Sequence, residues 1–506
     1  MDYNKMSVNP FDHYFLSWTP ERAGLVRPCY LSLANQLEKD ILSGKLAPGT
    51  KLPPQRELAD YLDLNFTTVT RAYDLCKERN LIYGVIGRGS YVSPLPKADI
   101  DGTNSKIIEL GLVNGFDFIR RPVIEATENV LKKGYLDQLY SYAEPAGHVH
   151  QRAAGVRWMA ELDVKTDIAH TAVFAGAQNV ISTALLSLFR LGDRIAADSC
   201  TYSNLIGTAK MMHIYLDPVS GDAEGMIPEE LDRLCRTRRI SGIFLMPNCA
   251  DPTTVTMTEN RKKELAEVIG KHGLILIEDD HEGAIRRNTG RSLFSFLPDQ
   301  TVYICGSTKG LCSGLRVTFA AFPEQFRERL LGGLHHLSIK TSSLDAEIMT
   351  ELINSGAAEL ILKEKRKLAR KANAIFDSVF PEHADPEKHL SFFRKLPLPE
   401  TKMDGVQIEK ALAEKGVSVH HSDRFSIRRR TGDPFLRVSV SSAGTAENLR
   451  KGLFILRETF PEAEFQNKSK KYDFRNNSEI KTIKHHTPAF SMSEASENKH
   501  KGSLKL

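Results

Sequence analysis

The chain has 506 residues, a length that predicts more than one domain. Its hydrophobic content of 41% and charged content of 26% are ordinary for a globular protein, and no apolar run approaches the length of a membrane span, so we expect no membrane segment. The formal net charge of +5 is a weak sign of nucleic-acid binding, because residues 466–506 alone carry nine Lys or Arg against four Asp or Glu.

The N-terminus has no signal-peptide pattern, and the seven cysteines are scattered without a C-x-x-C pair. Neither a metal site nor a disulfide framework is predicted, and the expected compartment is the reducing cytoplasm. Five regions follow one another along the chain. They are a leader at 1–26, a compact helical unit at 27–93, a polar linker at 94–106, an α/β domain at 107–465 and a disordered tail at 466–506.

In the helical unit, apolar residues recur at helical spacing over 30–42, a second helix follows the Pro-Pro pair at 53–54, and a third begins near Thr67. Two short β-rich runs then flank the turn at 87–89, which predicts a hairpin. Three helices and a hairpin are the layout of a winged helix-turn-helix, whose third helix enters the major groove of DNA. The alternative is a small helical domain whose arginines are merely solvated.

Three motifs in this unit, L-A-P-G-T-K-L-P-P-Q-R-E-L-A, T-T-V-T-R-A-Y and G-R-G-S-Y-V, resemble the winged helices of the GntR family. The resemblance implies that a set of polar residues faces phosphates or base edges, with the wing arginine in the minor groove or on the DNA backbone. These residues are Arg56, Thr67, Thr68, Thr70, Arg71 and Arg88. Phe66 stands where the family often has Arg, so either a DNA contact is lost or Phe66 packs against a thymine methyl.

In the α/β domain, apolar strand-like runs alternate with amphipathic helical stretches, which predicts a largely parallel sheet between helices. The motif E-D-D-H follows the apolar run at 274–277, and S-T-K-G-L-C-S-G-L-R follows the run at 302–305. An acid at the end of one strand and a lysine just past the next are what a pyridoxal phosphate (PLP) site needs. We expect Lys309 to form the Schiff base, or aldimine, and Asp279 to keep the pyridine nitrogen protonated.

The other parts of a PLP site also have candidates. The small residues of A-G-A-Q follow a predicted strand and open a helix, where backbone N–H groups can approach a phosphate. Tyr202 stands where an aromatic ring can stack on the cofactor, although alone it is more typical of a core residue. The candidates for the phosphate are Gly176, Ala177, Gln178, Ser307 and Arg316.

Residues from about 109 to 460 resemble the fold-type I aminotransferases, through the motifs above and through Y-A-E-P-A-G, P-N-C-A-D-P-T-T and F-L-R-V-S-V. The resemblance implies that fold, with a small C-terminal α+β subdomain. It also implies that Arg437 binds the α-carboxylate of an amino-acid ligand, and that Tyr142 reaches the cofactor phosphate of a neighbouring subunit in a homodimer. Asp251 and His281 replace the family's Asn and Tyr, which hydrogen-bond the phenolic oxygen of PLP, so we expect slow transamination.

A GntR-type head joined by a linker to an aminotransferase-like body resembles the MocR (GabR-type) family of bacterial transcription regulators. The resemblance implies a regulator that binds an operator with two half-sites and senses an amino acid, an amine or PLP itself through Lys309. A linker of roughly 10–15 residues spans at most a few tens of Å, so head and body should be coupled. The alternatives are a working aminotransferase with an appended DNA-binding domain, and a regulator that has lost PLP.

Overall fold

The computed structural model describes most of the chain from residue 16 to residue 460. The predicted tail lies outside the described residues, as do the predicted linker apart from its first residue and the first part of the predicted leader. The described ranges are 16–94, 107–286, 290–307, 309–385, 387, 390–399, 403–428 and 433–460.

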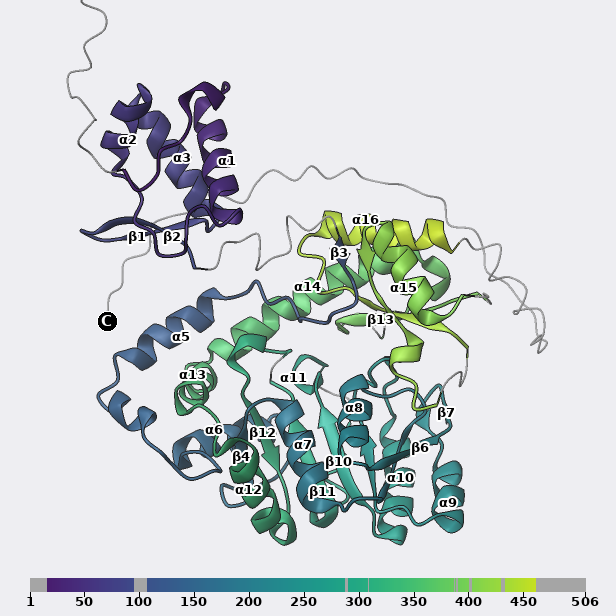
Figure 1. Ribbon diagram of the computed structural model, residues 1–506. Coiled ribbons are helices and arrows are strands. Elements are labelled where there is room, and N and C mark those ends of the chain that lie inside the picture. The colour runs from purple at the N-terminus through teal and green to yellow at the C-terminus, as the bar shows by residue number, and fades with distance from the viewer. Residues whose placement is uncertain are drawn as a thin grey trace, which may run out of the picture.

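The N-terminal head contains three helices and a two-stranded antiparallel hairpin around a core of its own (Figure 1). The third helix begins after Asn65, whose side chain accepts a hydrogen bond from the backbone N–H of Thr67 at 2.9 Å. This arrangement confirms the predicted winged helix-turn-helix. The elements of the head are α1 (Cys29–Leu42), α2 (Gln55–Leu62), α3 (Phe66–Glu78), β1 (Ile82–Val85) and β2 (Gly89–Val92).

The head extends further toward the N-terminus than the predicted boundary at residue 27. Trp18 is only 2% exposed and lies in the head core, and its indole N–H donates a hydrogen bond to Asp40 Oδ2 at 2.8 Å. A short 3-10 turn, Arg22–Gly24, then leads to α1. One buried tryptophan in a segment without periodicity gives no sequence pattern, so the sequence does not predict that this segment belongs to the head.

The body is built on a seven-stranded sheet in which neighbouring strands are parallel, except that β12 runs antiparallel to both of its neighbours. This confirms the predicted largely parallel sheet. In order across the sheet, the strands are β4 (Thr171–Phe174), β12 (Thr318–Ala321), β11 (Thr301–Cys305), β10 (Ile275–Asp280), β9 (Gly242–Leu245), β5 (Arg194–Asp198) and β6 (Tyr215–Val219).

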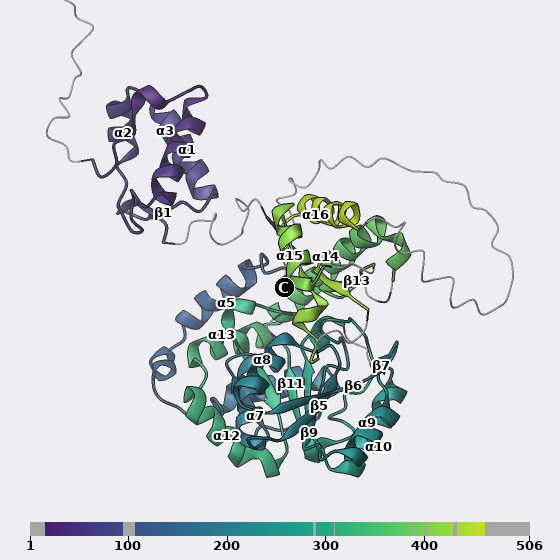
Figure 2. The ribbon, with the colours of Figure 1, turned by 45° about the vertical axis from the view of Figure 1, so that its right-hand side comes forward.

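Helices cover both faces of this sheet, which is why most residues of its central strands are buried (Figures 1 and 2). On one face, α7 and α12 pack against Phe174 and Phe244. On the other face, α6 packs against Phe319, while α9 and α10 pack against Ile243 and Leu276. The helices around the sheet are α6 (Val149–Ala160), α7 (Ala177–Leu188), α8 (Ser203–Met211), α9 (Pro228–Thr237), α10 (Glu259–His272), α11 (Gly283–Arg286) and α12 (Glu324–Ser338).

The later part of the chain forms the predicted smaller α+β subdomain around the three-stranded antiparallel sheet β13-β16-β15 (Figure 2). Strand β3 (Ile108–Glu109), the first element after the linker, pairs in parallel with β14 (Val417–Ser418). The segment that leaves the linker is therefore built into this subdomain. Its other elements, with the helices that join it to the larger part, are α5 (Arg121–Leu131), α13 (Ser343–Asn354), α14 (Ala357–Val379), β13 (Phe393–Pro397), α15 (Gly405–Glu414), β15 (His420–His421), β16 (Phe435–Ser439) and α16 (Ala446–Thr459).

Short elements complete the body. The strands β7 and β8 form a small hairpin beside α9, and single 3-10 turns connect several of the longer elements. These elements are β7 (Gly221–Asp222), β8 (Gly225–Met226), η3 (Leu136–Tyr140), η4 (Pro298–Gln300), η5 (Ser313–Leu315), η6 (Pro381–His383) and η8 (Ser422–Arg424).

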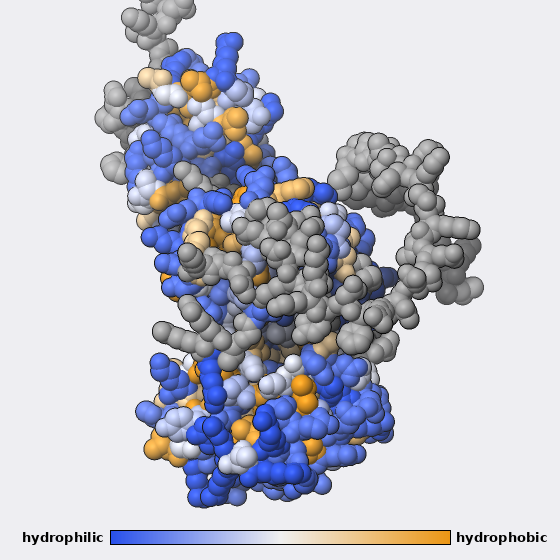
Figure 3. Space-filling model, turned by 90° about the vertical axis from the view of Figure 1, so that its right-hand side faces the viewer, coloured by the Kyte–Doolittle hydropathy of each residue, from blue (hydrophilic) through white to orange (hydrophobic). Residues whose placement is uncertain are grey.

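The surface is mainly hydrophilic on the face of the body seen in Figure 3, where hydrophobic residues occur in small groups. In the part of the chain that the structure describes, no helix combines the length and the apolarity needed to cross a bilayer. Most large apolar side chains lie instead in the cores of the head and the body.

Candidate cofactor pocket and DNA-binding head

A pocket opens at the carboxyl ends of the central strands of the body. Strands β10 and β11 are parallel neighbours, with Asp279 beside Ile304 and Asp280 beside Cys305. The acid at the end of β10 and the turn that follows β11 therefore meet at one edge of the sheet, where open α/β sheets bind their ligands. The cavity has a volume of about 90 Å³. Eight of the predicted site residues line it: Ala177, Gln178, Tyr202, Asp251, Asp279, His281, Lys309 and Arg316.

Asp279 presents a buried carboxylate to this pocket. It is 4% exposed, and its Oδ1 atom has no hydrogen-bond partner among the described residues. Burial raises the pKa of Asp279 to about 7, although the charge of Lys309 acts in the opposite direction. A buried acceptor without a partner is costly, and a protonated pyridine nitrogen is the kind of donor that would satisfy it. This residue therefore fits the predicted cofactor.

Lys309 lies between His281 and Asp251. Its Nζ is 3.3 Å from His281 Nδ1 and 3.8 Å from an oxygen of Asp251. The Nε2 atom of His281 is 2.8 Å from the carbonyl oxygen of Cys249, which can only accept, so Nε2 carries the proton and Nδ1 is an acceptor. Burial, followed by the charge of Lys309, lowers the pKa of His281 to about 3. His281 is therefore neutral, and it presents a lone pair to the lysine.

The turn before α7 provides room for an anion beside an arginine. Gly176 has a φ of +86°, and a Cβ atom at this position would lie 2.5 Å from Nη2 of Arg316. Only glycine suits both this backbone conformation and this close approach. The N-terminus of α7, with its unpaired backbone N–H groups and its dipole, then faces the same region as the guanidinium. Gln178 contributes less directly, because its amide donates to Thr208 Oγ1 at 2.8 Å.

Two predicted contacts of the phosphate are not made inside this pocket. Ser307 is fully buried, does not line the cavity, and donates its hydroxyl to the carbonyl of Val317. This serine is therefore engaged in holding the turn after β11. Tyr142 is 85% exposed between η3 and α6, where it contacts solvent rather than the pocket of its own chain.

Tyr202 lies on the rim of the pocket at the start of α8. Its hydroxyl accepts a hydrogen bond from the amide of Asn204 at 3.0 Å. Burial raises the pKa of Tyr202 to about 12, helped by the charges of Asp279 and Asp251. The ring is therefore uncharged and apolar, as a stacking partner for a flat aromatic ligand should be.

Arg437 lies behind the pocket rather than in it. It sits on β16, is 7% exposed, and does not line the cavity. Its Nη1 atom is 2.8 and 3.0 Å from the two oxygens of Asp251, so the two residues form a buried ion pair. The sequence predicts neither this pairing nor the distance of the guanidinium from the cavity.

Two residues that the sequence analysis does not single out hold the Lys309 turn in place. Lys365 on α14 is fully buried and donates from Nζ to the carbonyl oxygen of Lys309 at 3.0 Å. Burial lowers the pKa of Lys365 to about 8, although Asp117 acts in the opposite direction. Gly115 lies against the same carbonyl, since a Cβ there would be 2.4 Å from the oxygen. An isolated lysine or glycine gives no sequence signal for such a contact.

The predicted DNA-contacting side chains of the head lie at the start of α2, in the first two turns of α3 and on the wing. Arg56 and Phe66 are both exposed, and the guanidinium of Arg56 is 5.7 Å from the centre of the Phe66 ring. Phe66 thus supports Arg56. Arg71 is also exposed and stacks on the ring of Tyr30 at 4.2 Å.

The threonines divide by role. Thr67 binds the N-cap residue through both its backbone N–H and its hydroxyl, and Thr70 places its hydroxyl 2.9 Å from Gln55 Oε1. Thr68 lies in the same helical turn, and it is half-buried like Thr70. On the wing, Arg88 is exposed, and so is Ile86, which the sequence analysis does not single out. An apolar side chain at a wing tip is suited to contact with a groove floor.

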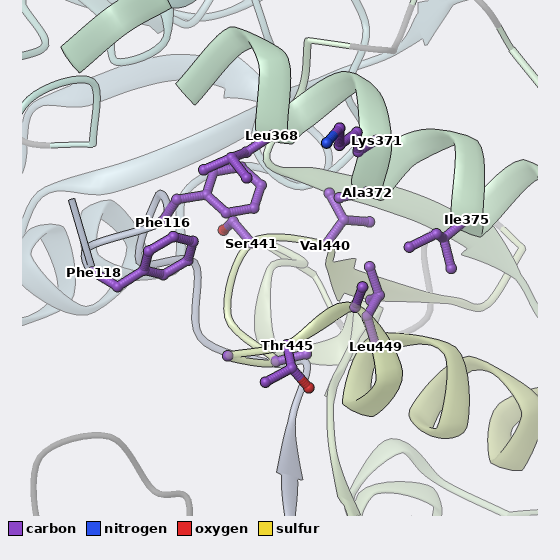
Figure 4. A pocket seen from close by; sticks show the side chains of 13 residues that line it. Phe116, Phe118, Leu368, Lys371, Ala372, Ile375, Val440, Ser441, Thr445 and Leu449 are labelled. Atoms are coloured by element: carbon purple, nitrogen blue, oxygen red, sulfur yellow. The ribbon is translucent and has the colours of Figure 1, made fainter. Parts of the chain in front are cut away.

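A second cavity of about 110 Å³ lies between α14, α16 and the segment before α5 (Figure 4). Its walls are mostly apolar, with Phe116, Phe118 and Leu449 prominent, and Lys371 is its charged lining residue. It contains none of the predicted site residues. No cluster of three or more His, Cys, Asp or Glu side chains suited to a metal occurs in the described ranges.

Known proteins match both parts of this chain. The gntR family of bacterial regulatory proteins matches residues 29–92, and the aminotransferase class I and II family matches residues 108–455, more than half of the chain. YdeF of Bacillus subtilis (strain 168), an HTH-type transcriptional regulator, is 33% identical over 456 residues, which cover 89% of this chain and 98% of YdeF. The chain belongs to the MocR family of transcription regulators. As a MocR-type protein it is a DNA-binding transcriptional regulator with an aminotransferase-like domain.

Other similarities agree with this assignment to the MocR family. PtsJ of Salmonella typhimurium, a vitamin B6 salvage pathway transcriptional repressor, is 24% identical over 290 residues, which cover 57% of this chain and 66% of PtsJ. The kynurenine aminotransferase of Pyrococcus horikoshii superposes with a TM-score of 0.64 at 19% identity, covering 72% of this chain and 93% of that structure. The solved structure confirms the aminotransferase fold of the MocR body.

The raised pKa of Asp279 predicts a pH-dependent stability of the PLP-free MocR protein. The folded-state pKa of about 7 exceeds the ordinary value of 3.8, so the folded state binds the proton more tightly than the unfolded state. This contribution to stability is fully present below about pH 4 and is lost as the pH rises to 7, by about 1.4 kcal/mol per pH unit. Asp279→Asn should remove that slope, which thermal unfolding at a series of pH values measures.

Asp198 supplies the matched comparison. Burial raises its pKa to about 7 as well, but it lines a different cavity. With PLP present, the slope due to Asp279 should disappear, because the cofactor's cation favours the carboxylate, whereas the slope due to Asp198 should remain. Equal slopes for wild type and Asp279→Asn without PLP would contradict this prediction.

Proposed function

We propose that this regulator binds PLP in the pocket at the carboxyl ends of β10 and β11, and that occupancy of the pocket changes how its heads bind an operator. The observation that carries the proposal is the convergence of Asp279, Lys309 and Arg316 on one cavity, with the carboxylate lacking a partner. The three residues come from the end of β10 and from the segment between β11 and β12, and they supply an acid, an amine and a permanent cation.

Different residues of the pocket would hold different parts of the cofactor. PLP, when bound, supplies an aldehyde carbon that reacts with amines and a ring that withdraws electrons. Lys309 would hold it covalently, and Asp279 would pair with its ring nitrogen. Arg316 and the N-terminus of α7 would hold its phosphate, and Tyr202 would cover one face of its ring. Lys365 and Gly115 keep the Lys309 turn in the position that this requires.

The pocket favours sensing over rapid transamination. The phenolic oxygen of PLP would lie near Asp251 and His281, by the resemblance of those positions to the aminotransferases. Asp251 is a carboxylate, whose pKa burial alone would raise but which the charges of Arg437 and Lys309 hold below its ordinary value. His281 has no proton on the nitrogen that faces Lys309. Neither side chain donates to the oxygen, so we expect turnover slower than about 1 s⁻¹, the lower end of ordinary enzymes.

The regulator is proposed to act as a homodimer on an operator with two half-sites. Tyr142 is a large, exposed aromatic side chain with no role in its own pocket. By its resemblance to the aminotransferases, this tyrosine would reach the cofactor phosphate of a neighbouring subunit. A dimer built in this way carries two heads, and two heads require two similar half-sites. The effector is a small amine or amino acid, or PLP itself.

Measurement of operator affinity with and without PLP tests the proposal. We expect PLP to change the affinity of the full-length wild-type chain several-fold, and to leave that of Lys309→Ala unchanged. Without PLP the two proteins should bind equally, because Lys309 lies in the body and not in the head. The alternative is an aminotransferase with an appended head. It would be established if PLP leaves the operator affinity unchanged and the protein transaminates steadily at about 1 s⁻¹ or faster.

A further inference from the structure

The guanidinium of Arg437 is already occupied by groups of its own chain. Nη1 contacts both oxygens of Asp251, while Nη2 donates to the carbonyl of Gly111 at 2.7 Å and lies 3.1 Å from His420 Nδ1. The Cζ atom of Arg437 is also 4.6 Å from the centre of the Phe425 ring. Of its nitrogens, only Nε has no partner among the described residues. The side chain is therefore held from several directions.

Asp251 separates this guanidinium from the cavity. Asp251 lines the pocket and is 1% exposed, whereas Arg437 does not line the pocket. The carboxylate of Asp251 is ionised, since Arg437 beside it holds its pKa below the ordinary value against the effect of burial. A ligand next to Lys309 therefore meets a carboxylate that has already neutralised the nearby arginine.

We propose that Asp251 acts as a built-in carboxylate on Arg437, so that the pocket selects a primary amine without a carboxylate on its amine-bearing carbon over the corresponding α-amino acid. This inference rests on the proposed function and names the ligand class of that same site. It is carried by the two contacts of Asp251 with Arg437 and by the position of Asp251 on the cavity wall.

The other groups around the cavity point the same way. An α-carboxylate would meet the carboxylate of Asp251, and the proposed cofactor uses the two cations that line the cavity, Lys309 and Arg316. A simple alkyl amine carries no carboxylate and therefore needs no further cation in the pocket. Like charges that meet without a counter-ion give selectivity against the unwanted ligand.

A matched ligand pair tests this selectivity on the PLP-loaded full-length wild type. Propylamine and L-2-aminobutyrate share one carbon skeleton, except that the second bears a carboxylate on the amine-bearing carbon. We expect the change in visible absorbance to be half-saturated by propylamine at a concentration at least about tenfold lower. An equal or tighter response to L-2-aminobutyrate overturns the proposal, and so does a wild type that responds to neither ligand.

The PLP-free chain gives a second test that does not depend on the cofactor. In Asp251→Asn the buried charge of Arg437 loses its counter-ion, and an added carboxylate can replace it. We expect propionate to raise the thermal unfolding temperature of Asp251→Asn. It should have no such effect on wild type, on the double variant Asp251→Asn/Arg437→Ala, or on Asp279→Asn, a matched loss of a pocket carboxylate.

The outcomes of the two tests separate the inference from the proposed function. If PLP does not bind, the proposed function fails. The propionate test then still decides whether the Asp251 carboxylate occupies the anion position on Arg437. If propionate stabilises wild type as much as Asp251→Asn, the inference is overturned while PLP binding stands. If Asp251→Asn does not fold, the wild-type comparison of propylamine with L-2-aminobutyrate decides alone.

Discussion

Lys309→Ala should abolish the visible absorption band that the full-length protein acquires with PLP. The physical reason is that the band requires a covalent C=N bond to the cofactor, and Lys309 is the amine that lines the pocket beside Asp279. The expected loss is complete rather than partial, and dialysis should then remove PLP from the variant but not from wild type. An absorbance spectrum before and after dialysis makes the measurement.

Lys371→Ala is the matched control for this experiment. Lys371 lines the second, apolar cavity and has no part in the PLP pocket, so its variant should keep the full band. Retention of the band in Lys309→Ala would assign the covalent bond to another lysine. Lys365→Met offers a graded case, because the fully buried Lys365 contacts Lys309 through its main-chain carbonyl and not through its amine. That variant should bind PLP covalently but release it faster.

Arg56→Ala should weaken operator binding by about 10²-fold, which is the second large effect. One good arginine contact with DNA contributes about 1–3 kcal/mol, and a dimer loses the contact in both heads. The side chain is exposed and supported by the ring of Phe66, so its loss leaves the core of the head intact. Fluorescence anisotropy with labelled operator at several salt concentrations measures both the affinity and its salt dependence.

Lys77→Ala is the control for the head. Lys77 lies in the last turn of α3, far along the helix from Phe66, and pairs on the surface with Asp74. Its removal should leave operator affinity nearly unchanged, because an exposed ion pair contributes little. Equal losses in the Arg56→Ala and Lys77→Ala variants would indicate a general effect of positive charge and would remove Arg56 from the set of specific contacts.

The sequence predicts those parts of the site whose position follows from the sheet. Asp279 and Lys309 each follow an apolar run, and the carboxyl ends of adjacent parallel strands meet by geometry. Gly176 is predictable for a similar reason, since a small residue must open a helix that faces an anion. The winged helix could be predicted as well, because the apolar spacing of its helices and the turn of its hairpin are local sequence patterns.

The contacts that join distant segments could not be predicted in this way. Asp251 and Arg437 are 186 residues apart, and their pairing depends on the packing of the small subdomain against the sheet. Ser307 has the sequence position expected of a phosphate contact, yet its hydroxyl donates a hydrogen bond to the backbone carbonyl of Val317. Trp18 is a single buried residue in a segment without a pattern. Each of these depends on tertiary structure rather than on local spacing.

Arg437 also contacts the part of the body nearest to the head. The carbonyl oxygen that it binds belongs to Gly111, two residues beyond β3, and β3 is the first element after the linker. A ligand that disturbs the ion pair between Arg437 and Asp251 therefore acts on the segment that directly follows the linker in the chain. Thermodynamic reciprocity then gives the operator a role of its own: whatever factor the ligand applies to operator affinity, the operator applies to ligand affinity. The ligand concentration that half-saturates the operator-bound protein therefore differs from the concentration that half-saturates the protein free in solution.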